Sequence, residues 1–366
     1  MKQRILYAVL FLSLISSNAL MAQDPTFSQY YSNKLYYNPA FAGADPGLRV
    51  NFNYRNLWTS LNSNFGTYNV NLDISDFNLG GGIGAVVVGN VEGDGLLRTN
   101  SYALNYSYRI TVMPRMCDVH IGLQAGYLQK SIDWSRFVFS DQLDPVYGQV
   151  YTSSAALPSN NKKGMFDAAA GIMTRFNIKK SRSRRIISTN IGFSVQHITQ
   201  PNESLIGGVQ RLPRKYVGHL SFMIPVSKKK ARSKNLTYLS PNFIYERQSV
   251  LQTFNLGLFA LRAPLVIGVW YRNGTPILIP RRTDALIFSL GFRQKDPNNG
   301  TFIYQFAYSY DLTLSKLAGS SGGSHEISLI LEFTSARLTN VRSNSARRKA
   351  RNCYNFNGPR NLPKIF

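Results

Sequence analysis

Segments in which apolar and polar residues alternate one for one recur along most of this chain. The first covers residues 48–55 and reads Leu-Arg-Val-Asn-Phe-Asn-Tyr-Arg, and similar segments cover residues 67–74 and 101–110. Successive side chains of a β-strand point to opposite faces, so a period of two places the apolar residues on one face and the polar residues on the other. The chain is therefore predicted to be all-β.

Similar segments continue through the rest of the chain, with almost no helical pattern between them. Together with the three above they predict about fourteen strands, an even number, as a closed antiparallel barrel made by one bacterial chain requires. The further strands are expected at Gly82–Asn90, Val119–Leu128, Phe166–Phe176, Ile186–His197, Tyr216–Ile224, Leu236–Glu246, Leu251–Leu261, Leu265–Tyr271, Ala285–Phe292, Phe302–Tyr310 and His325–Phe333.

Two all-β architectures fit this alternation. In a soluble sandwich the apolar faces would form the core, whereas in an outer-membrane barrel they would face lipid and the polar faces would line the lumen. The number of segments favours the barrel, as do the 21 Tyr and 22 Phe residues, many of which lie near segment ends. We predict a transmembrane antiparallel β-barrel of about 14 strands over residues 47–335. A soluble β-sandwich adhesin is the alternative.

The first residues have the features of an export signal. Lys2 and Arg4 precede an apolar run over residues 5–15, and Ala22 is a small residue of the kind that precedes a cleavage site. This run is too short to span a membrane as a helix. Residues 1–22 are therefore predicted to be a signal peptide. An exported protein is not expected to bind nucleic acid, despite a formal net charge of +24.

An arm rich in Tyr, Asn and Pro, residues 23–46, separates the signal peptide from the first strand. Its rings need a surface that buries them and pairs their hydroxyls, and Pro25 and Pro39 prevent a long helix. The arm either closes a domain or binds a partner, and we expect it to pack inside or across the periplasmic mouth of the barrel and plug it. The candidate residues for this role are Phe27, Tyr30, Tyr31, Tyr36, Tyr37, Asn38 and Pro39.

The even number of strands lets us predict which connections share a side. If the barrel begins and ends in the periplasm, the outward connections include Gln129–Gly164, Thr199–Arg214, Arg272–Asp284 and Leu314–Ser324. Residues 336–366 then form a basic periplasmic tail, which would face anionic lipid or an acidic partner. Cys117 and Cys353 lie on the same oxidising side, and we hypothesise that they form a disulfide.

Enzyme chemistry finds little support in the sequence. The four histidines form no His-Glu-x-x-His pair, and no Gly-x-Ser-x-Gly elbow occurs. Ser194 and His197 lie three residues apart on a predicted strand, so their side chains are expected on opposite faces. Two thiols cannot complete a tetrahedral zinc site. We therefore predict no catalytic residues, no cofactor and no metal.

The arm closely resembles the opening signature of the PorP/SprF family, outer-membrane proteins of the type IX secretion system and its gliding machinery. That family typically begins Gln-Asp-Pro-x-Phe-Ser-Gln-Tyr, as residues 23–30 do, and continues to Tyr-Tyr-Asn-Pro-Ala-x-Ala-Gly, as residues 36–43 do. Later strands also resemble it, above all the closing hairpin with Tyr-Ser-Tyr-Asp-Leu-Thr-Leu-Ser at residues 308–315 and Ser-His-Glu-Ile-Ser at residues 324–328. The tail departs from the family, because Tyr354 follows Cys353 where Pro is usual.

The resemblance implies an outer-membrane barrel that assists the secretion or surface attachment of a specific secreted adhesin or other cargo. Its expected partners are components of the type IX secretion system, a secreted cell-surface cargo protein and outer-membrane lipid. The alternative function is a transport barrel for hydrophobic or small solutes.

Overall fold

The computed structural model describes residues 24–60, 65–76, 78–93, 96–114, 116–154, 161–180, 185–226, 237–274, 283–296, 301–315 and 318–336. The signal peptide predicted for residues 1–22 lies outside this part of the chain, as does all but the first residue of the predicted tail. Both stay predictions.

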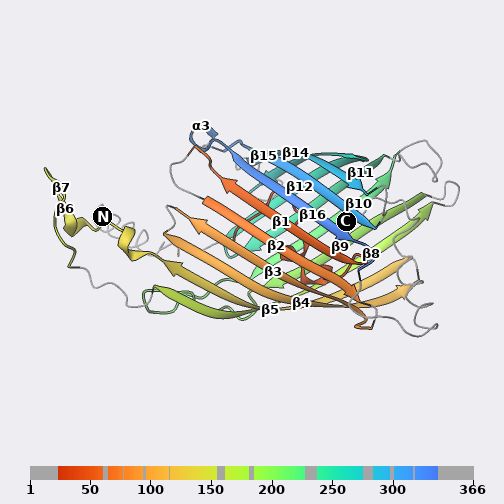
Figure 1. Ribbon diagram of the computed structural model, residues 1–366, viewed down its shortest axis with the longest axis horizontal. Helices are drawn as coiled ribbons and strands as arrows, with labels where there is room; N and C mark the ends of the chain where they lie inside the picture. Colours follow the sequence, from red (N-terminus) through yellow and green to blue (C-terminus); the bar gives the residue numbers. More distant parts are fainter. Residues whose placement is uncertain are drawn as a thin grey trace, which may run out of the picture.

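Within the described residues, fourteen strands pair antiparallel and close into one barrel, in the order β1-β16-β15-β14-β13-β12-β11-β10-β9-β8-β5-β4-β3-β2 (Figure 1). Hydrocarbon offers no partner to a free backbone N–H or C=O, so a sheet in lipid must close on itself. The strands are β1 (Leu48–Leu57), β2 (Phe65–Asp76), β3 (Gly81–Glu92), β4 (Leu97–Met113), β5 (Cys117–Ile132), β8 (Lys162–Lys180), β9 (Arg185–Gln196), β10 (Lys215–Pro225), β11 (Tyr238–Gln248), β12 (Leu251–Arg262), β13 (Leu265–Asn273), β14 (Thr283–Lys295), β15 (Phe302–Thr313) and β16 (Ser324–Phe333).

The first and last strands close the barrel. Phe52 of β1 lies opposite Val70 of β2 on one side and Leu329 of β16 on the other, and both ladders run the length of β1. Every strand predicted from the alternation is present. The sequence expectation of a closed antiparallel barrel with fourteen strands is confirmed.

The two faces of the wall differ as predicted. On β1, Asn51 and Asn53 are buried in the interior, whereas Phe52 and Tyr54 are 43% and 52% exposed on the outside. Because the exposed face is apolar and aromatic on every side of the barrel, it is a face for lipid. No helix among the described segments is both long and apolar enough to cross a membrane.

The connections at the two ends of the barrel have different lengths. At the end where β1 stops, they cover residues 58–64, 93–96, 133–161, 197–214, 249–250, 274–282 and 314–323; we call this the outer end. At the end where β1 starts, they cover residues 77–80, 114–116, 181–184, 226–237, 263–264 and 296–301; we call this the inner end. Longer loops on the extracellular side are typical of bacterial barrels, and from this difference we infer that the inner end faces the periplasm.

Short elements lie before and between the strands. The arm contains α2 (Lys34–Tyr37) and η1 (Pro39–Phe41). The connection from β5 to β8 extends away from the outer end and carries η2 (Trp134–Arg136), η3 (Ser140–Gln142), and the small hairpin of β6 (Leu143–Asp144) and β7 (Gly148–Gln149) (Figure 1). The helix α3 (Ala318–Ser321) lies at the same end.

Candidate functional site

The arm is packed inside the barrel, and its path has a clear direction. Asp24 contacts Gln248, the last residue of β11 at the outer end. Gly47 donates its N–H to Ser75 Oγ (3.0 Å), close to the inner end of β2. Between these points nearly every arm side chain is buried. The arm therefore runs from the outer end of the lumen to the inner end, where β1 begins, and this extends well beyond the periplasmic mouth where we expected it.

Glu326 of β16 holds the start of the arm. Its carboxylate accepts the backbone N–H of Ser28 (2.6 Å) and of Gln29 (3.3 Å), together with the side-chain amide of Asn53 (2.8 Å). Gln29 also donates its side-chain amide to the backbone carbonyl of Glu326 (2.9 Å). Because Glu326 bonds to two backbone N–H groups and one side-chain amide of the arm, it is a principal anchor of the arm.

A second anchor is centred on Asp311 of β15. Its Oδ2 pairs with Arg55 (2.9 Å) and Arg272 (3.0 Å), and it also accepts the Ser28 hydroxyl. Arg55 donates to the backbone carbonyl of Thr26 as well. The side chains of Ser28, Arg55, Arg272 and Asp311 are buried. A buried charge is tolerated only when it is paired and hydrogen-bonded, and here the arm supplies part of that pairing.

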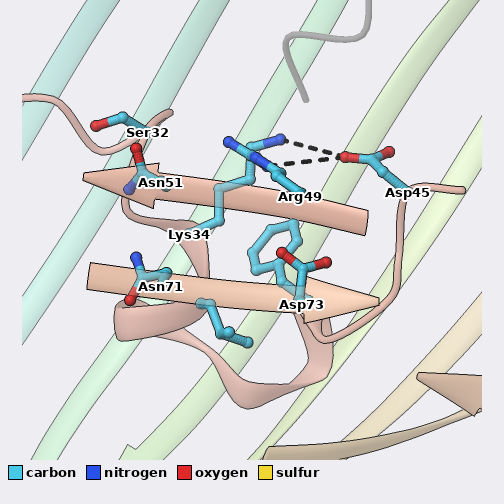
Figure 2. A pocket seen from close by; sticks show the side chains of 9 residues that line it. Ser32, Lys34, Asp45, Arg49, Asn51, Asn71 and Asp73 are labelled. Carbon is cyan, nitrogen blue, oxygen red and sulfur yellow. Dashed lines mark ion pairs between the residues drawn. The ribbon is translucent and has the colours of Figure 1, made fainter. Parts of the chain in front are cut away.

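Further along the arm, Asn33 meets amides from the wall. Its side-chain oxygen accepts the amide N–H groups of Asn51 (3.0 Å) and Asn69 (2.8 Å). A small polar cavity follows, and Lys34, Asp45, Arg49 and Asp73 are among the nine residues that line it (Figure 2). Asp45 lies 3.8 Å from both Lys34 Nζ and Arg49 Nη1, and 3.5 Å from a guanidinium nitrogen of Arg175.

Lys34 is a lysine buried to 3% exposure inside the barrel. Its ammonium lies 3.8 Å from the Asp45 carboxylate. The ammonium also lies 5.8 Å from the centre of the Phe41 ring.

The turn of the arm around η1 lies directly against the wall. The Asn38 side chain donates to the carbonyl of Ile172 (3.1 Å) and lies 3.1 Å from His219 Nε2, while its oxygen caps η1 at the Ala40 N–H (2.9 Å). A methyl group on Gly122 of β5 would collide with the backbone of Pro39 and Ala40. Glycine at this position therefore allows the close approach of arm and strand.

At the outer end, His197 links the arm to the wall. Its Nε2 lies 2.7 Å from Asp24 Oδ2 and its Nδ1 lies 2.9 Å from Asp167 Oδ2, while the Asp24 N–H donates to Gln248 Oε1 (3.0 Å). Burial alone would lower the pKa of His197, but the charge of Asp24 and the hydrogen bonds to both carboxylates raise it to about 10. The same contacts hold the pKa of Asp24 below its usual range, although burial opposes this. We call Asp24, Asp167, His197 and Gln248 the outer latch.

The position of His197 corrects one expectation from the sequence. His197 follows the last residue of β9 and has a left-handed backbone conformation (φ 56°), so it no longer follows the alternation of the strand. Its side chain therefore points to the interior, as does that of Ser194, whose hydroxyl donates to the backbone carbonyl of Tyr37. The two side chains share a face, and each contacts the arm.

The seven predicted arm residues lie together in the interior. Phe27 packs edge-on against Tyr36 (5.2 Å between ring centres), Tyr30 packs against Tyr37 (5.1 Å), and Tyr31 packs against Phe259 of the wall (4.7 Å). Asn38 and Pro39 lie at the start of η1. Their role as partner or plug residues stays a prediction.

The predicted disulfide is not tested. Cys117 is the buried first residue of β5 at the inner end, and Cys353 lies outside the described residues. The pair therefore stays a prediction.

Sequence reasoning missed the polar partners of the arm. These are Ser28, Gln29, Asn33, Lys34 and Asp45 on the arm and Arg55, Asp167, His197, Arg272, Asp311 and Glu326 on the wall. The alternation does mark most of the wall positions as facing inward. It contains no information about which of them meet the arm.

A cavity remains beside the outer latch. It offers about 570 Å³ of space, part of it continuous with solvent. The arm contributes Asp24, Pro25 and Tyr36 to its lining, and the wall contributes apolar and polar residues that include Val86, Val88, Thr99, Ser101, Gln124 and Leu128. In the described part of the chain, no group of three or more His, Cys, Asp or Glu side chains is placed to hold a metal ion.

Comparison with known proteins places the chain in a family. The family described as type IX secretion system membrane protein PorP/SprF matches residues 19–331. No curated protein matches the chain.

Several solved structures are similar to the barrel at low sequence identity. They include the CymD monoaromatic hydrocarbon channel (11% identity, TM-score 0.39, 83% of this chain and 91% of that one). A deltaS2S3 mutant of the TodX monoaromatic hydrocarbon channel is also similar (9% identity, TM-score 0.40, 84% of this chain and 93% of that one). So is an outer membrane channel from Pseudomonas putida F1 (9% identity, TM-score 0.38, 78% of this chain and 94% of that one). The chain is an outer-membrane β-barrel that belongs to the PorP/SprF family of type IX secretion system membrane proteins.

Proposed function

We propose that this barrel is a non-catalytic accessory subunit of the type IX secretion and gliding apparatus, and that it assists the secretion or surface attachment of a specific secreted adhesin or other cargo. Membership of the family supports the association with the secretion system. The observation that carries the proposal is the arm, which crosses the interior with its charged groups paired to the wall. A barrel filled in this way suits a docking subunit better than an open pore.

The outer loops supply the surface for cargo in this proposal. On the β6–β7 hairpin, Val146 and Tyr147 are 80% and 79% exposed, and Val150 and Tyr151 are also exposed. The backbone there is ordered, because Asp144 accepts the N–H groups of Val146 (2.8 Å) and Tyr147 (3.0 Å). Exposed apolar side chains on a defined scaffold outside the membrane are typical of a protein-binding surface.

A pull-down tests this function. Tagged protein is purified in detergent from cells that carry the secretion system, and bound proteins are identified by mass spectrometry. Replacing Val146, Tyr147, Val150 and Tyr151 with serine is expected to remove a secreted protein from the eluate and to release that protein into the medium. The matched control is Val250→Ser, which changes an equally exposed residue in the β11–β12 turn. Retention of all bound proteins by the hairpin variant would contradict the loop assignment.

The arm serves as a plug in this proposal. Deleting residues 24–43 removes the groups that fill the interior and is expected to raise single-channel conductance in planar bilayers. Because the wall keeps all of its strand pairing, the deleted form should still show the heat-dependent gel shift of a folded barrel. Unchanged conductance in a folded barrel would show that the arm does not block the lumen.

One observation favours the second candidate function, a transport barrel for hydrophobic or small solutes. The cavity beside the outer latch is continuous with solvent and has a mixed apolar and polar lining. This function predicts that cells take up such a solute and that cells without the protein do not. It also predicts that no secreted cargo protein is recovered in the pull-down.

A further inference from the structure

The position of Asp24 bears on where the mature chain begins. The barrel strands start and end at the inner, periplasmic end, so a barrel of this kind would ordinarily have its amino terminus there. Here the arm that precedes β1 starts at the opposite end. Asp24 is held by His197 and Gln248, which lie at the outer ends of β9 and β11.

The path between the two ends is fixed by contacts at every level of the barrel. Ser28 and Gln29 bond to Glu326 in the outer half, and Asn38 bonds to the Ile172 carbonyl in the middle. Nearer the inner end, the carbonyl of Ala44 accepts a hydrogen bond from Arg175 (3.0 Å). Between these contacts the arm folds back once: the Tyr31 carbonyl accepts a hydrogen bond from Arg49 near the inner end, whereas the Tyr36 carbonyl accepts one from Gln196 at the outer end. The arm nevertheless starts at the outer end of the lumen and leaves it at the inner end.

We propose that the mature chain begins at the outer mouth of the barrel, so that its amino terminus faces the cell exterior although the barrel itself begins and ends in the periplasm. With cleavage before Gln23, one residue precedes Asp24. One residue reaches at most about 3.6 Å, whereas the 10 residues of β1 span roughly 33 Å. The amino terminus therefore cannot return to the periplasm while the arm is seated.

The outer latch keeps the amino terminus in this place. Asp24 makes two polar contacts, one through its carboxylate and one through its N–H, and His197 connects the carboxylate to Asp167 of β8. The cavity beside the latch is partly continuous with solvent and is lined by Asp24 and Pro25. A molecule that approaches from outside the cell thus meets the first residues of the arm, and the amino terminus becomes part of the surface that the outer loops present.

Labelling of intact cells tests the proposal. One cysteine is inserted directly before Asp24 in a chain whose Cys117 and Cys353 are serine, and the cells are treated with a membrane-impermeant maleimide. Two controls define the sides: Val146→Cys, which is 80% exposed on the outer hairpin, and Met116→Cys, which is 53% exposed in an inner turn. The inserted cysteine is expected to react in intact cells, as Val146→Cys does. Met116→Cys is expected to react only after permeabilisation.

Labelling of the inserted cysteine only after permeabilisation would overturn the proposal. If the serine background fails to assemble, an epitope inserted before Asp24 in the native chain gives the same test with an antibody. Assembly is verified in each case by the heat-dependent gel shift. The readout does not involve cargo, so a failed secretion assay and a failed labelling assay are distinguishable.

Discussion

Replacing Glu326 with glutamine is expected to loosen the arm without unfolding the barrel. The Glu326 carboxylate receives three N–H groups, from Ser28 (2.6 Å), Asn53 (2.8 Å) and Gln29 (3.3 Å). Glutamine has nearly the same shape but carries no charge, and its amide nitrogen would face one of these donors. The strand pairing of β16 uses only backbone groups and is preserved.

The magnitude follows from the number of bonds. A hydrogen bond contributes about 1 kcal/mol, while a buried donor that is left without a partner costs about 1–3 kcal/mol. We therefore expect the free energy of arm opening to fall by about 2–4 kcal/mol, which is roughly a 30-fold to 1,000-fold rise in the open population.

Hydrogen exchange of the purified protein in detergent measures this change. Peptides that cover residues 24–46 should lose protection by the stated factor in Glu326→Gln, because their amide groups exchange through local opening. The matched control is Glu332→Gln, which makes the same chemical change on the same strand where the carboxylate bonds to Arg293 of the wall (2.9 Å). Equal protection of the arm in Glu326→Gln and in the native protein, or an equal loss in both variants, would refute the assignment of Glu326 as the anchor.

Two further predictions concern the seating of the arm. The pKa of His197 is raised to about 10 from 6.5, so the seated arm binds more protons than the free arm between these values. In Lys34→Met, protection of the arm should fall from pH 7 to 9 after correction for intrinsic exchange, and adding His197→Gln should remove this fall; a rise in Lys34→Met would contradict the sign of the shift. Gly122→Ala should weaken arm seating by about 1–3 kcal/mol through overpacking, whereas Gly218→Ala, where a methyl group meets open space, should leave exchange of the arm unchanged.

The alternation was sufficient to predict the wall because lipid imposes a simple rule on it. Each strand needs an apolar outer face, so residues such as Phe52, Leu104 and Leu290 mark both the strand and the face, and all fourteen strands follow. The rule has no equivalent for the loops. The β6–β7 hairpin, which is held by Asp144 outside the membrane, has no long alternating segment and was not predicted.

The path of the arm could not be predicted for a different reason. Its contacts join residues far apart in the sequence, such as Gln29 with Glu326 and Asp24 with His197, and a local pattern contains no information about such pairs. His197 shows the second limit. Its left-handed backbone conformation after the end of β9 turns the side chain inward. Counting alternating positions along the strand assigns this side chain to the outer face, which is wrong.

The arm and the wall also account for each other's composition. A barrel whose strands alternate must line its interior with polar residues, and in this chain several of them are charged and buried. Water could satisfy these groups in an open channel, but here the arm reaches them with backbone N–H groups, hydroxyls and amides, as at Glu326 and Asp311. Removing the arm therefore leaves paired wall charges such as Arg55 with Asp311 partly uncovered. The polar residues of the arm are therefore as much a part of the interior as those of the strands.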